Sequence, residues 1–156
     1  MNPTIKVDTI NRRLTPEDWA QLSPSLDVVV DATDSFQSRF ELNEYCVRYK
    51  IPLVSGAAIR FEGQVTVFLP EDNNSPCYRC LYNGEGLDQT CSQTGVIAPL
   101  LGIIGSIQAL ETLKLLAGIG EVLVGKLLIF DAIQMEWQTM QFRKNPKCPV
   151  CGQSEA

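Results

Sequence analysis

Apolar residues in the first half of the chain alternate between continuous runs and a helical spacing. The segment Asp27–Asp34 is a continuous β-branched run with carboxylates at both ends, which is typical of a strand covered on both faces of a parallel sheet. In Phe36–Tyr49 apolar side chains recur at spacings of three and four residues, which predicts a helix. Ile51–Ser55 then predicts the next strand. Strand and helix alternate in this half of the chain.

The N-terminal segment and the segment after Ser55 give weaker patterns. Thr4–Ile10 is short and β-branched, which predicts a strand, and Thr15 followed by Pro16 predicts the start of a short helix. Arg60–Leu69 alternates with a period of two, as in an antiparallel strand with one more exposed face. Gly56 and Gly63 are expected to mark the bends around that strand.

The longest apolar stretch of the chain, Val96–Ala117, is interrupted by Pro99, Gln108, Glu111 and Lys114. Gln108, Glu111 and Lys114 follow one another at a spacing of three, so they are expected to form one solvent-exposed edge of a helix, a wet edge. The pattern therefore predicts a helix buried in a soluble domain and excludes a membrane span.

The C-terminal third predicts two more strands, Lys126–Ala132 and Glu136–Phe142, joined by a tight connection. Between the early and late elements, Tyr82–Gly95 is polar and predicts a crossover loop. The chain has no internal repeat, low-complexity segment or linker. We therefore expect residues 1–156 to form a single α/β domain, with a Rossmann-like mixed sheet, helices and late antiparallel strands.

Composition and charge narrow the class of partner. The chain has 156 residues, of which 45% are hydrophobic and 20% charged, as in a globular domain. Its net charge of −5 and its isoelectric point near 4.7 argue against nucleic acid as a partner, because affinity for phosphates depends on Lys and Arg. The N-terminus shows no signal peptide, so a cytoplasmic location with reduced thiols is expected.

Two Cys-x-x-Cys pairs, Cys77/Cys80 and Cys148/Cys151, lie far apart in a chain without histidine. Four thiolates at this spacing predict a tetrahedral Zn²⁺ site that joins two distant segments. Because four protein ligands leave no open coordination position, the metal is expected to be structural, as a zinc knuckle. The alternative is a pair of redox-active dithiols of the thioredoxin kind.

Asp34 follows the predicted strand Asp27–Asp34 and precedes a helix, which is where ligands bind in open α/β sheets. A carboxylate there can hold Mg²⁺ when a nucleotide supplies phosphate oxygens. The alternative is a turn aspartate that caps the next helix. Asp31 is expected to be structural. Three arginines in the chain are equally compatible with binding phosphate or carboxylate groups and with solvated surface charges: Arg39, Arg60 and Arg79.

Cys91 stands alone in the predicted crossover loop. The absence of histidine excludes a papain-like dyad. The helix that starts near Val96 would lower the pKa of a nearby thiol through its dipole, which makes Cys91 a candidate nucleophile. The alternative is a spare thiol on a loop.

The segment Gly120–Leu127 matches the glycine and lysine positions of a phosphate-binding loop. However, Leu127 stands where Ser or Thr must bind magnesium, and a strand follows instead of a helix. The segment is therefore not expected to bind phosphate.

These motifs, in this order, resemble those of the C-terminal half of the MoeB and ThiF adenylyltransferases, which are relatives of the ubiquitin-activating enzymes. The resemblance covers nearly the whole chain and is carried by the following segments: 31–34 (DATD), 52–56 (PLVSG), 62–64 (EGQ), 77–80 (CYRC), 95–99 (GVIAP), 108–111 (QALE) and 148–152 (CPVCG). It implies ATP-dependent adenylation of the C-terminal glycine of a ubiquitin-like sulfur carrier protein.

The resemblance also implies roles for individual residues. Asp34 matches the aspartate that binds magnesium and ATP, and Ser35 beside it stands where Asn is usual. Cys91 matches a loop cysteine that forms a covalent link to the carrier in ThiF-like and ubiquitin-activating members, whereas MoeB-like members need not use it. The segment 55–64 is closer to MoeB, which favours molybdopterin biosynthesis. The alternatives are a ThiF-like role in thiamine biosynthesis and a zinc-stabilised module that binds the carrier without catalysis.

One departure from the family changes the expectation for this chain. The family carries its glycine-rich nucleotide site in an N-terminal half that has no counterpart here, so the chain is similar to the C-terminal half alone. We therefore expect residues 1–156 to bind ATP poorly and to be inactive without that half. Missing strands also predict an open sheet edge and apolar surface, which favour a homo-oligomer.

Overall fold

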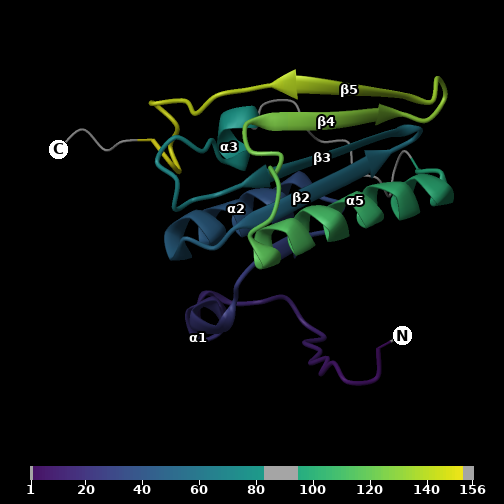
Figure 1. The fold of residues 1–156 in the computed structure, drawn as a ribbon. Helices are drawn as coiled ribbons and strands as arrows, with labels where there is room; N and C mark the ends of the chain where they lie inside the picture. Colours follow the sequence, from purple (N-terminus) through teal and green to yellow (C-terminus); the bar gives the residue numbers. More distant parts are fainter. Residues whose placement is uncertain (1, 83–94, 153–156) are drawn as a thin grey trace.

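The computed structural model describes residues 2–82 and 95–152. Within these residues the elements are α1 (Pro16–Leu22), the 3-10 turn η1 (Ser23–Ser25), β1 (Val29–Asp31), α2 (Phe36–Tyr49), β2 (Leu53–Ile59), β3 (Glu62–Phe68), α3 (Tyr78–Leu81), α5 (Ala98–Ala117), β4 (Lys126–Asp131) and β5 (Glu136–Gln141). The strands form one sheet in the order β1-β2-β3-β4-β5. Figure 1 shows β2 to β5 side by side. Only β1 and β2 are parallel, and the later pairs are antiparallel. The prediction of a mixed α/β sheet with late antiparallel strands is confirmed.

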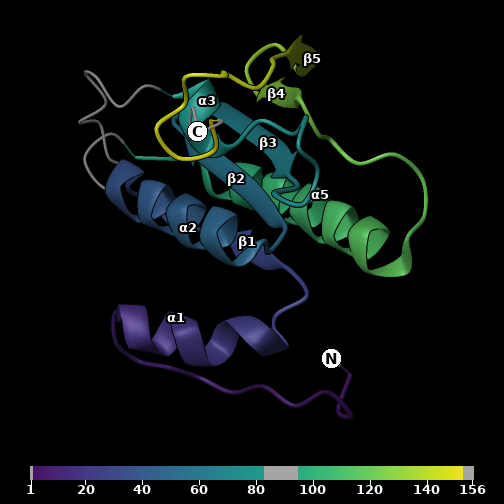
Figure 2. The ribbon, with the colours of Figure 1, turned by 90° about the vertical axis from the view of Figure 1, so that its left-hand side faces the viewer.

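Helices cover both faces of the sheet, and β2 lies between α2 and α5 (Figure 2). On the α2 face Leu53, Phe68 and Tyr78 form a buried cluster. On the α5 face Val65, Leu100 and Ile104 form another. The two clusters use alternate residues of the strands, because neighbouring side chains in a strand point to opposite faces.

The prediction of a strand at Thr4–Ile10 is wrong. In the described structure this segment begins in a turn and a bend, continues as irregular backbone and pairs with no strand, and Ile5, Val7 and Ile10 are exposed. β-Branched residues favour a strand only where a neighbouring strand covers them. The predicted helix start is confirmed, since Thr15 caps α1 in a reciprocal capping box with Asp18.

The unit β1–α2–β2 follows the predicted order. The bounds of α2 match the predicted helix Phe36–Tyr49. In contrast, the run Asp27–Asp34 forms only a three-residue strand, and Val30 is 46% exposed. The prediction that both faces of this run are covered is therefore wrong. Strand β1 lies at an edge of the sheet, so part of its surface has no neighbour.

Gly56 and Gly63 do not mark bends. They lie inside β2 and β3, opposite Val65 and Ala58. The bend between the strands is at Arg60, which has a positive φ of 52°. A Cβ on Gly56 would come within 2.2 Å of the Gln108 side chain, and one on Gly63 within 2.5 Å of Ile104. Both glycines are needed because α5 approaches the sheet closely.

Strand β3 also differs from the expectation that one of its faces is more exposed. Val65, Thr66, Val67 and Phe68 are all buried, because α5 covers one face and the region of α3 covers the other. Strands β4 and β5 confirm the two predicted late strands. β5 is the other edge of the sheet, and all its residues are exposed.

The orientation of α5 is the largest difference from the sequence analysis. Gln108 and Glu111, the expected wet edge, are 5% and 4% exposed, whereas Leu110 and Leu113 are 57% and 62% exposed. By length and composition α5 is the one helix in the described residues that could cross a membrane. It nevertheless packs on β2 and β3, where Gln108 bonds the backbone of β1 and β2, and Glu111 accepts from the N–H of Leu123 in the segment before β4.

Candidate functional site

The two Cys-x-x-Cys pairs meet on the α2 side of the sheet. The four Sγ atoms of Cys77, Cys80, Cys148 and Cys151 all lie within 4.8 Å of one another. Cys77 Sγ is 3.7 Å from Cys148 Sγ, and Cys80 Sγ is 3.4 Å from Cys151 Sγ. The prediction that the two pairs come together is confirmed.

Local backbone geometry makes each pair a tight turn. Cys80 N donates to Cys77 O at 2.9 Å, and Gly152 N donates to Cys148 O at 2.9 Å. Any side chain at Gly152 would collide with the carbonyl oxygen of Cys148, at 2.4 Å from an added Cβ. The sulfurs also accept hydrogen bonds, from Asn43 Nδ2 to Cys77 at 3.7 Å and from Asn145 N to Cys80 at 3.4 Å.

This arrangement fits a tetrahedral zinc ion. Zn–S bonds of about 2.3 Å in a tetrahedron place sulfurs roughly 3.8 Å apart, close to the two separations above. Burial raises the pKa of the Cys77 thiol to about 11, so a bound cation would be needed to keep that sulfur as a thiolate at neutral pH. The donors from Asn43 and Asn145 are of the kind that orient metal ligands. A zinc ion here would hold β3, α3 and the C-terminal segment together.

A second site lies at the carboxyl ends of the two parallel strands. Strand β2 continues four residues past the last paired residues, Asp31 and Ser55, and so leaves space beyond the end of β1. A cleft of about 320 Å³ occupies this position. Its walls come from the tip of β1, from β2 and from α5: Ala32, Thr33, Asp34, Gly56, Ala57, Ala58, Val96, Leu101, Ile104, Gly105 and Gln108, with Arg39 beneath them. This is the place where ligands bind in open α/β sheets.

Asp34 is exposed and lines this cleft, as well as a smaller adjacent hollow of about 90 Å³ that Glu62 and Gln64 border. Ser35 is the N-cap of α2, and its Oγ accepts a hydrogen bond from Ser38 N at 3.2 Å. The capping task that the sequence offered as an alternative for Asp34 is therefore performed by Ser35. The carboxylate of Asp34 is left free to face the cleft.

Asp31 and Arg39 lie behind Asp34, and both are buried. Their closest atoms, Asp31 Oδ2 and Arg39 Nε, are 3.9 Å apart. Gln108 Nε2 donates to Asp31 O at 2.7 Å and thereby ties α5 to the end of β1. The sequence indicated a structural Asp31, which its burial and contacts support. It left Arg39 as either an anion-binding residue or a solvated surface charge, and the structure buries Arg39 beside the Asp31 carboxylate. It placed Gln108 on a solvent-exposed helix edge, and the structure instead buries this residue.

The family model described as the ThiF family matches residues 1–150. The chain belongs to this family. The cleft beside Asp34 and three of the four clustered cysteines lie within the matched residues, and Cys151 directly follows them.

Two enzymes and one solved structure show how far the likeness of this ThiF-family chain extends. It is 46% identical to the molybdopterin-synthase adenylyltransferase of Escherichia coli K12 over 154 residues, covering 98% of this chain and 61% of that enzyme. It is 38% identical to the sulfur carrier protein ThiS adenylyltransferase of the same strain, covering 100% of this chain and 62% of that enzyme. The crystal structure of E. coli MccB with ATP aligns with a TM-score of 0.69 at 20% identity, over 90% of this chain and 45% of that one, which shows a shared fold. The chain thus spans about three fifths of the length of the two enzymes.

Cys91 falls in the segment 83–94, which lies outside the described residues. The segment Gly120–Leu127 leads into β4 and not into a helix, so the prediction that it is no phosphate-binding loop is supported. Within this segment, Lys126 Nζ lies 3.6 Å from Glu121 Oε2.

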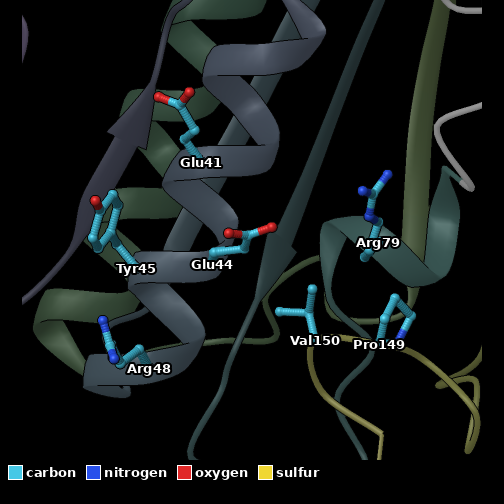
Figure 3. Close-up of a pocket in the computed structure, with 7 residues that line it drawn as sticks. All are labelled: Glu41, Glu44, Tyr45, Arg48, Arg79, Pro149 and Val150. Atoms are coloured by element: carbon cyan, nitrogen blue, oxygen red, sulfur yellow. The ribbon is translucent and has the colours of Figure 1, made fainter. Parts of the chain in front are cut away.

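A third hollow, of about 550 Å³, separates α2 from the knuckle (Figure 3). Glu41, Glu44, Tyr45 and Arg48 of α2 line one side, and Arg79 and the 149–150 segment line the other. Glu41 is paired with Arg13, and the Arg79 guanidinium lies 4.0 Å from the centre of the Phe40 ring. Two of its charged residues, Glu41 and Arg79, are thus engaged within the chain, and we assign no chemistry to this hollow.

Proposed function

We propose that this chain is the magnesium-binding and carrier-binding part of an ATP-dependent adenylyltransferase that activates the C-terminal glycine of a ubiquitin-like sulfur carrier. The observation that carries the proposal is Asp34, an exposed carboxylate at the tip of β1 beside a cleft at the ends of the parallel strands. The adenylyltransferases that the chain is similar to support the reaction class.

In this reaction the carrier carboxylate attacks the α-phosphorus of ATP, a P–O bond to pyrophosphate breaks, and an acyl-adenylate forms. Asp34 would hold a magnesium ion, which neutralises charge on the phosphates when it is bound. Ser35 would contribute to the cofactor site while capping α2. The small residues Gly56, Ala57 and Ala58 leave room in the cleft for a narrow chain end.

The four cysteines would bind Zn²⁺ as a structural ion. Their role would be to fix the end of β3 relative to the C-terminal segment, so that the sheet presents its strand ends rigidly. The carrier-linking role of Cys91 stays a prediction, as do the cytoplasmic location and the absence of nucleic acid and membrane partners.

The molybdopterin pathway is favoured over the thiamine pathway, because identity to the molybdopterin-synthase enzyme is 46% and identity to the ThiS enzyme is 38%. A non-catalytic, zinc-stabilised module that binds the carrier is the second candidate. It is favoured by one observation: the chain matches only about three fifths of either enzyme. We propose that residues 1–156 are a single domain corresponding to the C-terminal part of the enzyme, with weak ATP binding of its own.

Pyrophosphate exchange with the purified carrier tests the proposal. The chain should be measured alone and fused behind the unmatched N-terminal part of the E. coli molybdopterin-synthase adenylyltransferase. We expect exchange in the fusion only, and a loss of at least about 100-fold in Asp34→Asn, because one transition-state charge contact is removed. Glu71→Gln, an exposed carboxylate in the turn after β3, is the matched control and should retain activity.

Carrier binding without exchange in the fusion would support the non-catalytic module instead. Low-micromolar affinity of the isolated chain for Mg-ATP, measured by calorimetry, would contradict the expectation that the isolated chain binds ATP poorly. Both outcomes are read from the same protein preparations.

We also infer that the chain self-associates. Leu101, Leu110, Leu113 and Leu116 of α5 are between 51% and 62% exposed, and no strand within the described residues pairs with the outer edge of β1. An apolar helix face beside an open strand edge favours contact with a second copy. A monomer by light scattering at high concentration would exclude this.

A further inference from the structure

The backbone of Thr33, directly before Asp34, is held from both sides by buried charged side chains. Its N–H and its Oγ1 donate to Asp31 Oδ1 at 2.9 and 2.8 Å. Its carbonyl oxygen accepts from Arg39 Nη2 at 2.7 Å. Both polar backbone groups of this residue are therefore bonded, although the residue lies outside regular structure, between β1 and α2.

Burial makes these bonds costly to break. The side chains of Asp31 and Arg39 are 1% and 6% exposed, and each charge requires a partner in so dry a place. Asp31 also faces Ser55 Oγ at 3.4 Å, and its carbonyl oxygen accepts from Gln108. Asp31 is thus fixed by the sheet and by α5, while Arg39 is fixed by its position in the first turns of α2.

The residue after Asp34 is fixed as well. Ser35 caps α2, and Arg39 N donates to Ser35 O at 3.1 Å as one of the first hydrogen bonds of that helix. Asp34 therefore lies between a residue clamped by Arg39 and a residue bound into α2. Arg39 spans the two, because its backbone belongs to the helix and its guanidinium reaches back to Thr33.

We infer that Arg39 is a positioning residue, which fixes the Thr33–Asp34 tip so that the Asp34 carboxylate faces the cleft. The catalytic consequence rests on the proposed function, whereas the structural consequence does not. A positive charge at position 39 is not sufficient by itself to fix the Thr33–Asp34 tip. The planar guanidinium places one nitrogen toward Asp31 and another at Thr33 O, and a lysine ammonium cannot reach both positions in the same way.

Arg39→Lys and Arg39→Met test the inference, with Arg48→Lys as the control on the exposed side of the same helix. In the isolated chain, exchange of the Thr33 amide hydrogen, which is bonded to Asp31, should accelerate at least about tenfold in both Arg39 variants, as expected for the loss of a charge-assisted hydrogen bond nearby. The ¹³C resonance of the Asp34 carboxylate should broaden or shift. The control should match the wild-type protein.

Arg39→Lys separates positioning from simple stabilisation, because it keeps a positive charge beside Asp31. If it folds with a near wild-type melting temperature but shows the faster exchange, the fork geometry is what holds the tip. If amide hydrogen exchange and the ¹³C resonance of the Asp34 carboxylate are both unchanged in this variant, the inference is overturned. If Arg39→Met fails to fold, Arg39→Lys alone still decides whether the guanidinium holds the Thr33–Asp34 tip.

The second test uses the fusion that carries out pyrophosphate exchange. In it, Arg39→Lys should raise the Mg²⁺ concentration needed for half-maximal pyrophosphate exchange at least about tenfold, because the same hydrogen bond is lost. Its maximal rate at saturating Mg²⁺ should fall less. If the wild-type fusion shows no exchange, the proposed function fails, and the hydrogen-exchange result still decides whether Arg39 fixes the tip. An unchanged Mg²⁺ dependence together with a loosened tip would show that Asp34 does not bind the metal.

Discussion

The two faces of the sheet are closed by different means. On the α2 face, aromatic rings of Phe40, Phe68 and Tyr78 pack edge to face, and the four cysteines lie directly beside them. On the α5 face, Leu100 and Ile104 pack on the sheet, but the same helix also sends Gln108 and Glu111 toward it and turns leucines outward. One face is closed by apolar packing next to the cysteine cluster, and the other is also held by hydrogen bonds from α5.

This difference explains how the chain positions its site. With the proposed zinc ion bound, the cysteine cluster would join two segments that are distant in sequence and so stabilise the whole α2 face. The bonds from Gln108 act at the end of β1, where Asp34 lies. We therefore expect changes on the knuckle side to affect global stability, and changes on the α5 side to have smaller and more local effects.

Removing a metal ligand should have the largest effect. Cys77→Ser should destabilise the fold by roughly 5 kcal/mol or more, because structural zinc contributes on the order of 10 kcal/mol to small metal-dependent domains. Elemental analysis should find one zinc per wild-type chain and less in the variant, with a lower melting temperature. Cys46→Ala is the matched control, since this buried thiol lies outside the cluster. Full zinc content in Cys77→Ser would contradict the assignment.

Gly56→Ala should break the hydrogen bonds that Gln108 of α5 makes to the sheet. The new Cβ would overlap Gln108 and force it away from Asp31 O and Val54 O, at a cost of about 2–3 kcal/mol. At Gly102 the same change meets no atom within 4 Å, and it should stabilise the helix by up to ~1 kcal/mol. Chemical denaturation of both variants measures the difference. Equal effects would show that α5 does not contact β2 closely.

The inverted polarity of α5 can be tested by two alanine substitutions. Glu111→Ala should cost about 1–3 kcal/mol, because it leaves the partly buried N–H of Leu123 without its 2.9 Å partner. Leu113→Ala, at an exposed position, should change the free energy of unfolding by less than about 0.5 kcal/mol. If the leucine change proves the more costly in the monomer, the helix is rotated relative to the structure described here.

The smallest effect is expected at the N-terminal helix. Hydrogen bonds from Arg12 and from the Thr15 backbone hold the pKa of Asp18 well below its usual range. Because the folded-state pKa is lowered, the contribution of Asp18 is complete above its ordinary pKa of 3.8 and is lost only as the pH falls through the lower folded value. Trp19, which stacks on Tyr45 at 4.9 Å, reports the docking of α1.

In a Trp137→Phe background, the fluorescence of Trp19 should stay constant from pH 7 to pH 4 and change in stronger acid. Asp18→Asn removes the titrating group and should abolish that acid step. A transition near neutral pH in the parent protein would argue that another group controls the docking of α1.

Some of this structure was predictable because short-range patterns specify it. The spacing of apolar residues fixed Phe36–Tyr49 as a helix, and the local chemistry of Thr15 and Asp18 fixed the start of α1. The position of Asp34 at a strand end also followed from the order of the elements. Arg39 and Gln108 could not be found this way, because each acquires its role only when a backbone carbonyl from another part of the chain comes within reach.

The sequence by itself identified the four clustered cysteines as candidate metal ligands, because a Cys-x-x-Cys turn presents its two sulfurs toward one point whatever surrounds it. Only the tertiary structure decided which side of α5 faces the sheet. Apolar periodicity placed the leucines inside, but unpaired polar groups at the end of β1 and at Leu123 needed hydrogen-bond partners, and Gln108 and Glu111 supply them. Burying those polar groups unpaired would cost more than leaving leucines exposed, so the polar edge of the helix lies against the strands.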